Sequence, residues 1–141
     1  MQYGNKTYLF IHAIWRTQEG ELFLTKPVRN VLFSHIRTAA EEKMVKILII
    51  NGVEDHVHCL FQLHPMQTLS KVIKDIKSES ARWINENKIV AGTFDWQDNY
   101  VAYSVSPSAL KQVWEYIERQ EEHHKTKTLE NELEIFEKIQ F

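Results

Sequence analysis

The chain has 141 residues, of which 43% are hydrophobic and 26% charged, and its 17 basic and 19 acidic residues give a formal net charge of −2. This composition is typical of a soluble globular protein with a hydrophobic core, and it excludes a disordered or collagen-like chain. Without the acidic segment 121–141 the net charge is +1, which neither supports nor excludes DNA as a partner. No apolar run approaches the ~20 residues that span a bilayer. With no signal-peptide pattern and a single cysteine, Cys59, we expect a cytoplasmic protein without disulfides or zinc fingers.

The first half of the chain predicts a strand, a helix and a hairpin. Residues 7–15 are rich in β-branched and aromatic side chains and predict a strand. A helix is expected from Pro27, which suits a first helical turn, to about residue 43. Residues 45–50 and 57–63 then predict two strands, with Asn51-Gly52 as a turn signal. We therefore expect an antiparallel hairpin with a somewhat long loop.

The second half predicts another helix, a strand and two further helices. Thr68 is expected to cap a helix whose apolar residues lie on one side as far as Ile84. Residues 100–105 predict a strand, and Ser106-Pro107 is a typical helix start. A final acidic helix is expected at 129–141. The order predicts a single α+β domain, 1–141, with a ferredoxin-like (split βαβ) antiparallel four-stranded sheet, helices on one face and extra C-terminal helices. The other face of the sheet is expected to stay open for a ligand, a nucleic acid or a second subunit.

The most informative stretch is the strand that begins near His56. Because alternate residues of a strand share a face, Val57 and Cys59 are expected to pack under the helices, while His56 and His58 lie together on the opposite face. Two adjacent imidazoles can donate two nitrogens to one divalent cation. The alternative is a pair of histidines on a half-exposed strand that only form hydrogen bonds with their neighbours.

A second group of polar residues lies near the C-terminus. Tyr116 and Gln120 are four residues apart, so on one continuous helix they lie one above the other at its edge. The alternative is an ordinary amphipathic helix with a half-buried tyrosine. His123 or His124 can face the same site, although an exposed pair near a helix end is the simpler interpretation. Other phenols, such as that of Tyr103, are expected to be residues of the sheet.

Together these two groups resemble the HUH superfamily, in which a strand carries His-hydrophobic-His and a C-terminal helix carries a tyrosine. More narrowly, the chain is similar to the single-tyrosine transposases of the smallest bacterial insertion sequences, including their REP-associated relatives. The resemblance extends over segments 51–58, 69–83, 94–105 and 116–120.

The resemblance implies a DNA transposase that cleaves and rejoins single-stranded DNA at hairpin-bearing ends. Tyr116 matches the nucleophile that forms a 5′-phosphotyrosine, and His56, His58 and Gln120 match the ligands of a divalent metal, Mg²⁺ or Mn²⁺. Two imidazoles alone also suit Zn²⁺ or Co²⁺. The family works as a homodimer, so Tyr116 of one chain can serve the histidines of the other in trans.

Contacts to DNA are expected from a stripe of basic residues on the helix after Thr68 and from one loop tryptophan. The candidates are Lys71, Lys74, Lys77, Arg82 and Trp96. A solvated helix face and a packing anchor are the respective alternatives. Residues 16–21 hold one base and two acids, where the family usually carries basic residues that bind the hairpin.

Two other functions stay open at this point. One is a non-catalytic ferredoxin-like module that binds nucleic acid through its open sheet face. The other is a domesticated HUH nickase. The acidic C-terminal helix can cover the site, exchange between subunits or cap the core.

Overall fold

The computed structural model describes residues 4–125 and 127–139, with side chains as far as residue 137. Its strands are β1 (Phe10–Arg16), β2 (Lys46–Val53), β3 (His56–Gln62) and β4 (Val101–Val105). They form one antiparallel sheet in the order β2-β3-β1-β4. The two βαβ halves and this strand order confirm the predicted ferredoxin-like α+β fold.

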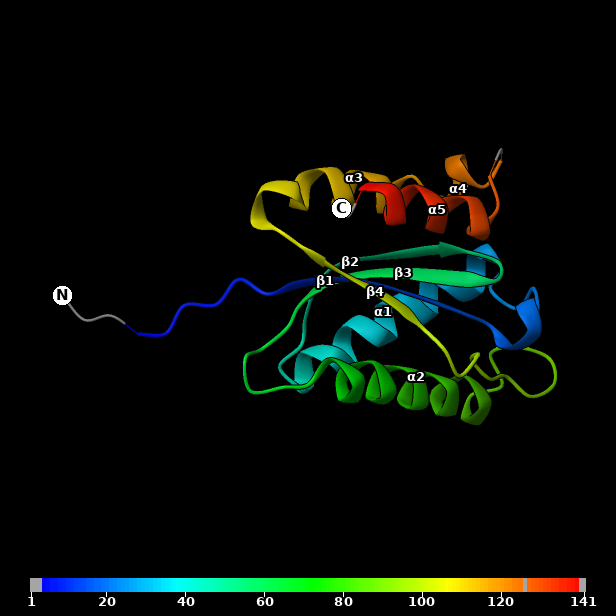
Figure 1. The fold of residues 1–141 in the computed structure, drawn as a ribbon. Coiled ribbons are helices and arrows are strands. Elements are labelled where there is room, and N and C mark those ends of the chain that lie inside the picture. Colours follow the sequence, from blue (N-terminus) through cyan, green and yellow to red (C-terminus); the bar gives the residue numbers. More distant parts are fainter. Residues whose placement is uncertain (1–3, 126, 140–141) are drawn as a thin grey trace.

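Two long helices cover one face of the sheet, α1 (Lys26–Glu42) and α2 (Leu69–Glu86) (Figure 1). As the alternation in β3 predicts, Val57, Cys59 and Phe61 are buried in the core beneath these helices. Thr68 caps α2 as expected, since its hydroxyl accepts a hydrogen bond from the backbone N–H of Lys71 at 3.4 Å. None of the helices in the described part of the chain is long and apolar enough to span a membrane.

The opposite face of the sheet is covered as well, which corrects the expectation of an open face. After a short 3₁₀ turn, η2 (Pro107–Ala109), the chain forms α3 (Leu110–Glu118), α4 (Gln120–His123) and α5 (Leu129–Ile139), and all three lie over this face (Figure 1). The physical reason is a second, smaller apolar cluster, in which Leu60 of β3 packs with Ile117 of α3. Since this sheet face also carries buried apolar side chains, it needs a cover of its own.

The hairpin between β2 and β3 is tighter than expected, and Asn51-Gly52 is not its turn. Both residues lie inside β2, and Glu54 and Asp55 alone separate the two strands. Gly52 is needed because a Cβ atom built there would lie 2.3 Å from the backbone carbonyl oxygen of His56. The glycine therefore allows β2 to approach the start of the histidine strand closely.

Replacing Gly52 with alanine is expected to lower the free energy of unfolding by about 3 kcal/mol, because the new methyl group would meet backbone that cannot move aside. Urea denaturation measures the change. Gly4→Ala is the control, since no atom lies within 4 Å of the Cβ position there. Equal stability of the two variants would contradict the close approach at Gly52.

The single cysteine offers a second test of the core. Cys59 is fully buried, and this burial raises the pKa of its thiol to about 12. At pH 8 about one thiol in 10⁴ is then ionised. Iodoacetamide is therefore expected to leave the native protein unmodified and to alkylate it readily in urea, as mass spectrometry would detect. Rapid alkylation of the native protein would contradict this packing of β3.

Candidate active site

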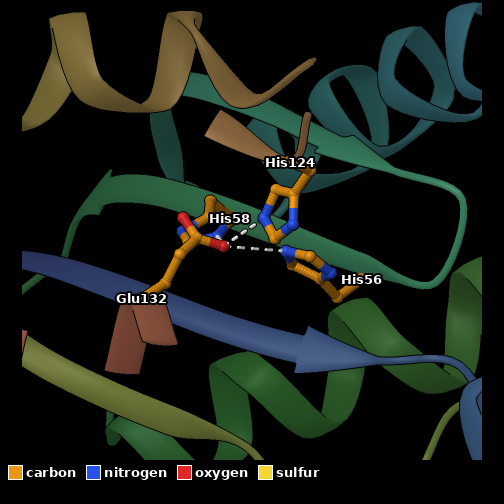
Figure 2. Close-up of side chains that lie close together, drawn as sticks. All are labelled: His56, His58, His124 and Glu132. Atoms are coloured by element: carbon orange, nitrogen blue, oxygen red, sulfur yellow. Dashed lines mark hydrogen bonds and ion pairs between the residues drawn. The ribbon is translucent and has the colours of Figure 1, made fainter. Parts of the chain in front are cut away.

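Four potential metal ligands converge on the sheet face that the C-terminal helices cover. His56 and His58 come from β3, His124 follows α4, and Glu132 comes from α5 (Figure 2). Their ligand atoms all lie within 4.8 Å of one another. Oε1 of Glu132 lies 3.2 Å from Nε2 of His56 and 3.4 Å from Nε2 of His58, and it also contacts Nε2 of His124.

The outer nitrogens of the two strand histidines are held by other side chains. Nδ1–H of His56 donates to the Asp55 carboxylate at 2.7 Å, and Nδ1 of His58 lies 2.8 Å from Nε2 of His12. Without a cation, Nε2 of each ring hydrogen-bonds to Glu132; with a cation bound and His58 donating to His12, the Nε2 lone pairs of both rings can face that cation. Metal-binding histidines are commonly oriented by such partners.

Burial and the neighbouring polar groups shift the pKa values of these side chains in opposite directions. Burial lowers the pKa of His58 to about 4, so this ring is neutral near pH 7. Burial also opposes the charged form of His56, but its hydrogen bonds to Asp55 and Glu132 prevail and raise its pKa. For Glu132 the cost of burial is outweighed by hydrogen bonds to His124, His56 and His58, which hold its pKa well below the usual range. The centre therefore contains an anion that hydrogen bonds from the surrounding imidazoles stabilise.

The structure brings the predicted nucleophile and the predicted third ligand to the same point. The Tyr116 hydroxyl donates to Oε2 of Glu132, and Nε2 of Gln120 donates to the same oxygen at 3.1 Å. Gln120 is fully buried, and its Oε1 has no hydrogen-bond partner among the described residues. A buried acceptor without a donor is unfavourable unless a further group binds it.

The helix that carries these two residues is interrupted, whereas one continuous helix was expected. α3 ends at Glu118 and α4 begins at Gln120. Asn51 explains the break, because its side-chain amide donates to the carbonyls of Ile117 and Glu118, both at 3.0 Å. The change of direction lets Tyr116 and Gln120 reach Glu132 together.

Tyr116 itself is half-buried between aromatic rings. Its ring stacks on His123 with centroids 4.1 Å apart, and Phe136 of α5 meets it edge-on at 4.9 Å. Burial, followed by the neighbouring Glu132 carboxylate, raises the pKa of the Tyr116 hydroxyl. With Glu132 in place, this phenol is therefore a weak nucleophile.

The donor set fits a divalent cation. Two ligand atoms bound to one cation at ~2.1 Å with tetrahedral angles lie about 3.4 Å apart. The separations of 3.2 and 3.4 Å between Glu132 and the two strand histidines, which are hydrogen-bond distances here, are close to this spacing, and all four ligand atoms lie within 4.8 Å of one another. Three imidazoles, one carboxylate and the unpartnered oxygen of Gln120 are all common metal ligands.

Three members of the site were missed or undervalued in the sequence. His12 lies on the same face of β1 as Phe10 of the smaller apolar cluster, but nothing in its own segment indicates that it pairs with His58, 46 residues away. His124 follows Gln120 by four residues, a spacing that pointed to the site, yet the simpler exposed pair was preferred. For Glu132 the signal was overlooked: it follows Leu129 by three residues and precedes Phe136 by four, so it shares their apolar face of the helix.

The residues predicted to contact DNA lie on α2 or near it, across the sheet from the histidines (Figure 1). Lys71 pairs with Asp75 at 3.0 Å, and Lys77 donates to the backbone carbonyls of Gln97 and Asn99. Lys74 and Arg82 are exposed. For these four residues DNA contact stays a prediction.

For Trp96 the structure corrects the expectation of base stacking. Its side chain is only 3% exposed, its ring meets Trp15 and Phe94 edge-on, and its Nε1–H donates to Ser80 at 2.9 Å. Trp96 is therefore a packing anchor, since the core encloses a ring that would have to be open to stack on a base.

Known proteins match most of the chain. Residues 5–120 match the family described as "Transposase IS200 like". ISDra2 transposase TnpA of Deinococcus radiodurans is 27% identical over 115 residues, which cover 77% of this chain and 81% of that protein. A crystal structure described as a transposase of D. radiodurans R1 superposes with a TM-score of 0.66 at 25% identity, covering 85% of this chain and 98% of the other. A REP-associated tyrosine transposase, solved with a REP hairpin, has a TM-score of 0.64 at 14% identity over 88% and 74% of the two chains, and shows the shared fold alone.

Proposed function

Because the chain belongs to the IS200-like transposase family, and is a DNA transposase on that ground, we propose that it cleaves and rejoins single-stranded DNA with Tyr116 as the nucleophile. One observation carries this proposal. The Tyr116 hydroxyl and the Gln120 amide meet at the same carboxylate as His56 and His58, although they come from a different part of the chain. We further propose that residues 1–141 act as one domain, since α5 contributes Glu132 to this centre.

We propose His56, His58 and Gln120 as ligands of the catalytic divalent cation. When bound, such a cation polarises a phosphate oxygen and stabilises the charge that develops on it. Asp55 and His12 orient the two imidazoles, and the unpartnered Gln120 oxygen supplies a third donor. Of the two cations that the resemblance implies, Mn²⁺ fits this nitrogen-rich set better than Mg²⁺, which prefers oxygen ligands.

The reaction of Tyr116 is a transesterification. Its oxygen forms a bond to the scissile phosphorus while the bond to the 3′-oxygen of the preceding nucleotide breaks. The phenolic proton ends on that oxygen, which leaves a 5′-phosphotyrosine and a free 3′-hydroxyl. Because one phosphodiester replaces another, the reverse attack by a 3′-hydroxyl rejoins the strand without ATP.

We propose hairpin-bearing single strands as the substrate. The chain shares its fold with a REP-associated tyrosine transposase that was solved with a REP hairpin, which supports this substrate class. The candidate phosphate contacts are four basic residues of α2, Lys71, Lys74, Lys77 and Arg82. Replacing any one of them with alanine is expected to weaken DNA binding to a similar extent for all base sequences.

In a homodimer, each active site can be built from one chain (in cis) or from two chains (in trans). The resemblance implies two chains that exchange their tyrosine helices, but in this structure the rings of Tyr116 and His58 lie 6.2 Å apart within one chain. We propose a homodimer whose resting sites are each built in cis. A mixture of Tyr116→Phe and His56→Ala chains is then expected to form no DNA adduct in a denaturing gel assay. Recovery of adduct in the mixture would put the sites in trans.

The proposed function is tested by covalent trapping. Labelled single strands that carry the hairpin ends of the element are incubated with the protein and Mn²⁺, with and without EDTA, and separated on a denaturing gel. We expect a shifted band that EDTA abolishes. Hairpin binding without any adduct would instead favour the non-catalytic binding module. An adduct from one strand without rejoining would favour a domesticated nickase.

A further inference from the structure

The C-terminal helix places an acid at the centre of the site. Glu132 of α5 is fully buried, and both of its oxygens are engaged. Oε1 faces His56, His58 and His124, while Oε2 accepts from Tyr116 and Gln120. One side chain therefore contacts every residue to which a metal or nucleophile role is assigned above.

This position is the one that the scissile phosphate needs in the proposed reaction. A bound phosphodiester must direct one anionic oxygen to the cation and present its phosphorus to Tyr116. The Glu132 carboxylate is also an anion with two oxygens, of which one faces the metal ligands and the other faces Tyr116. We propose that Glu132 is a metal ligand of the resting protein and a stand-in for the scissile phosphate, so that DNA has to displace α5. This inference rests on the proposed function.

The packing of α5 supports an intramolecular occupant of the DNA site. The ring of Phe136 lies between those of His12 and Tyr116, with centroid distances of 4.8 and 4.9 Å, respectively. Glu130 at the start of α5 pairs with Arg16 at 3.5 Å. The described helix carries four acids, at positions 130, 132, 134 and 137. An acidic helix thus covers the place where an acidic polymer is expected to bind, and it engages a cation, Arg16, that displacement would make available to a phosphate.

Coordination chemistry also supports displacement of Glu132 by the substrate. Together with the Gln120 oxygen, three imidazoles and one carboxylate would take five of the six positions of an octahedral cation such as Mn²⁺. A catalytic site needs an open position for its substrate. Glu132 is the ligand that can leave with least disruption, since His56 and His58 are fixed in the sheet and Glu132 is carried by the C-terminal helix (Figure 2).

The test uses the full chain with Mn²⁺ and dimethyl phosphate, the smallest stable phosphodiester, as probes. Water-proton relaxation reports how many water molecules bind the protein-held Mn²⁺, and ³¹P relaxation reports phosphodiester binding. We expect Glu132→Gln and Glu132→Ala to weaken Mn²⁺ binding, to raise its hydration and to tighten dimethyl phosphate binding by about tenfold. Glu134→Gln, on the exposed side of the same helix, is the matched control and is expected to behave as the unmodified protein.

Three outcomes would overturn the inference. Unchanged Mn²⁺ hydration in both Glu132 variants would show that α5 does not reach the cation. Weaker dimethyl phosphate binding in these variants would make Glu132 part of the substrate site instead of its competitor. Retention of Mn²⁺ by His58→Ala would overturn the proposed metal centre as well. If His58→Ala loses Mn²⁺ while the Glu132 variants change nothing, the inference about α5 fails and the proposed function stands.

Discussion

Replacing Tyr116 with phenylalanine is expected to abolish the covalent protein–DNA adduct and to lower strand cleavage by about 10⁴-fold or more. The change removes the attacking oxygen and leaves the ring, which packs between His123 and Phe136, in place. Folding and DNA binding should therefore persist. Denaturing gels with labelled single strands measure the adduct, and gel shifts measure binding.

Tyr103→Phe is the matched control for this loss. Tyr103 is a second phenol on the same side of the sheet, where its ring stacks on Phe136 and lies 6.1 Å from His12. Removal of the Tyr103 hydroxyl is expected to leave the amount of adduct at the level of the unmodified protein. Cleavage that survives in Tyr116→Phe and disappears in Tyr103→Phe would show that Tyr103, and not Tyr116, is the nucleophile.

His58→Ala is expected to have the second-largest effect. It removes one of the two imidazoles that the sheet fixes, and it leaves His12 without the partner that it contacts at 2.8 Å. Affinity for Mn²⁺ should fall by about a hundredfold or more, and DNA cleavage should fall with it. Isothermal titration calorimetry with Mn²⁺ measures the first quantity, and the adduct assay measures the second.

His35→Ala provides the comparison for a histidine outside the site. His35 lies on α1, pairs with Glu79 at 2.7 Å and stacks on Trp83, on the other face of the sheet. We expect it to cost stability without affecting Mn²⁺ affinity. A metal site that survives His58→Ala at full affinity would be inconsistent with the centre built on β3.

Local patterns in the sequence were enough for most of the fold. The alternation around Cys59 predicted which face of β3 joins the core and which carries His56 and His58, because strand parity is a local property. The cap at Thr68 and the helix start at Ser106-Pro107 were also read correctly, since capping depends on a few neighbouring residues.

Features that depend on long-range contacts were not predictable in the same way. Asn51 looked like a turn residue, yet it lies inside β2 and interrupts the tyrosine helix by hydrogen bonds to residues 66 and 67 positions away. The cover on the second sheet face and the role of Glu132 likewise depend on how α5 docks. The spacing of Glu132 from Leu129 and Phe136 places it on the apolar face of α5, but local spacing does not show against which residues that face packs.

The central claim is that Tyr116 forms a covalent bond to DNA at the centre built by His56 and His58. Its most direct test is proteolysis of the trapped complex, nuclease trimming of the DNA and mass spectrometry of the peptides. The account predicts a 5′-nucleotide on the peptide that contains Tyr116, formed with Mn²⁺ and absent with EDTA. A nucleotide on any other residue, or an adduct that forms equally well without metal, would contradict it.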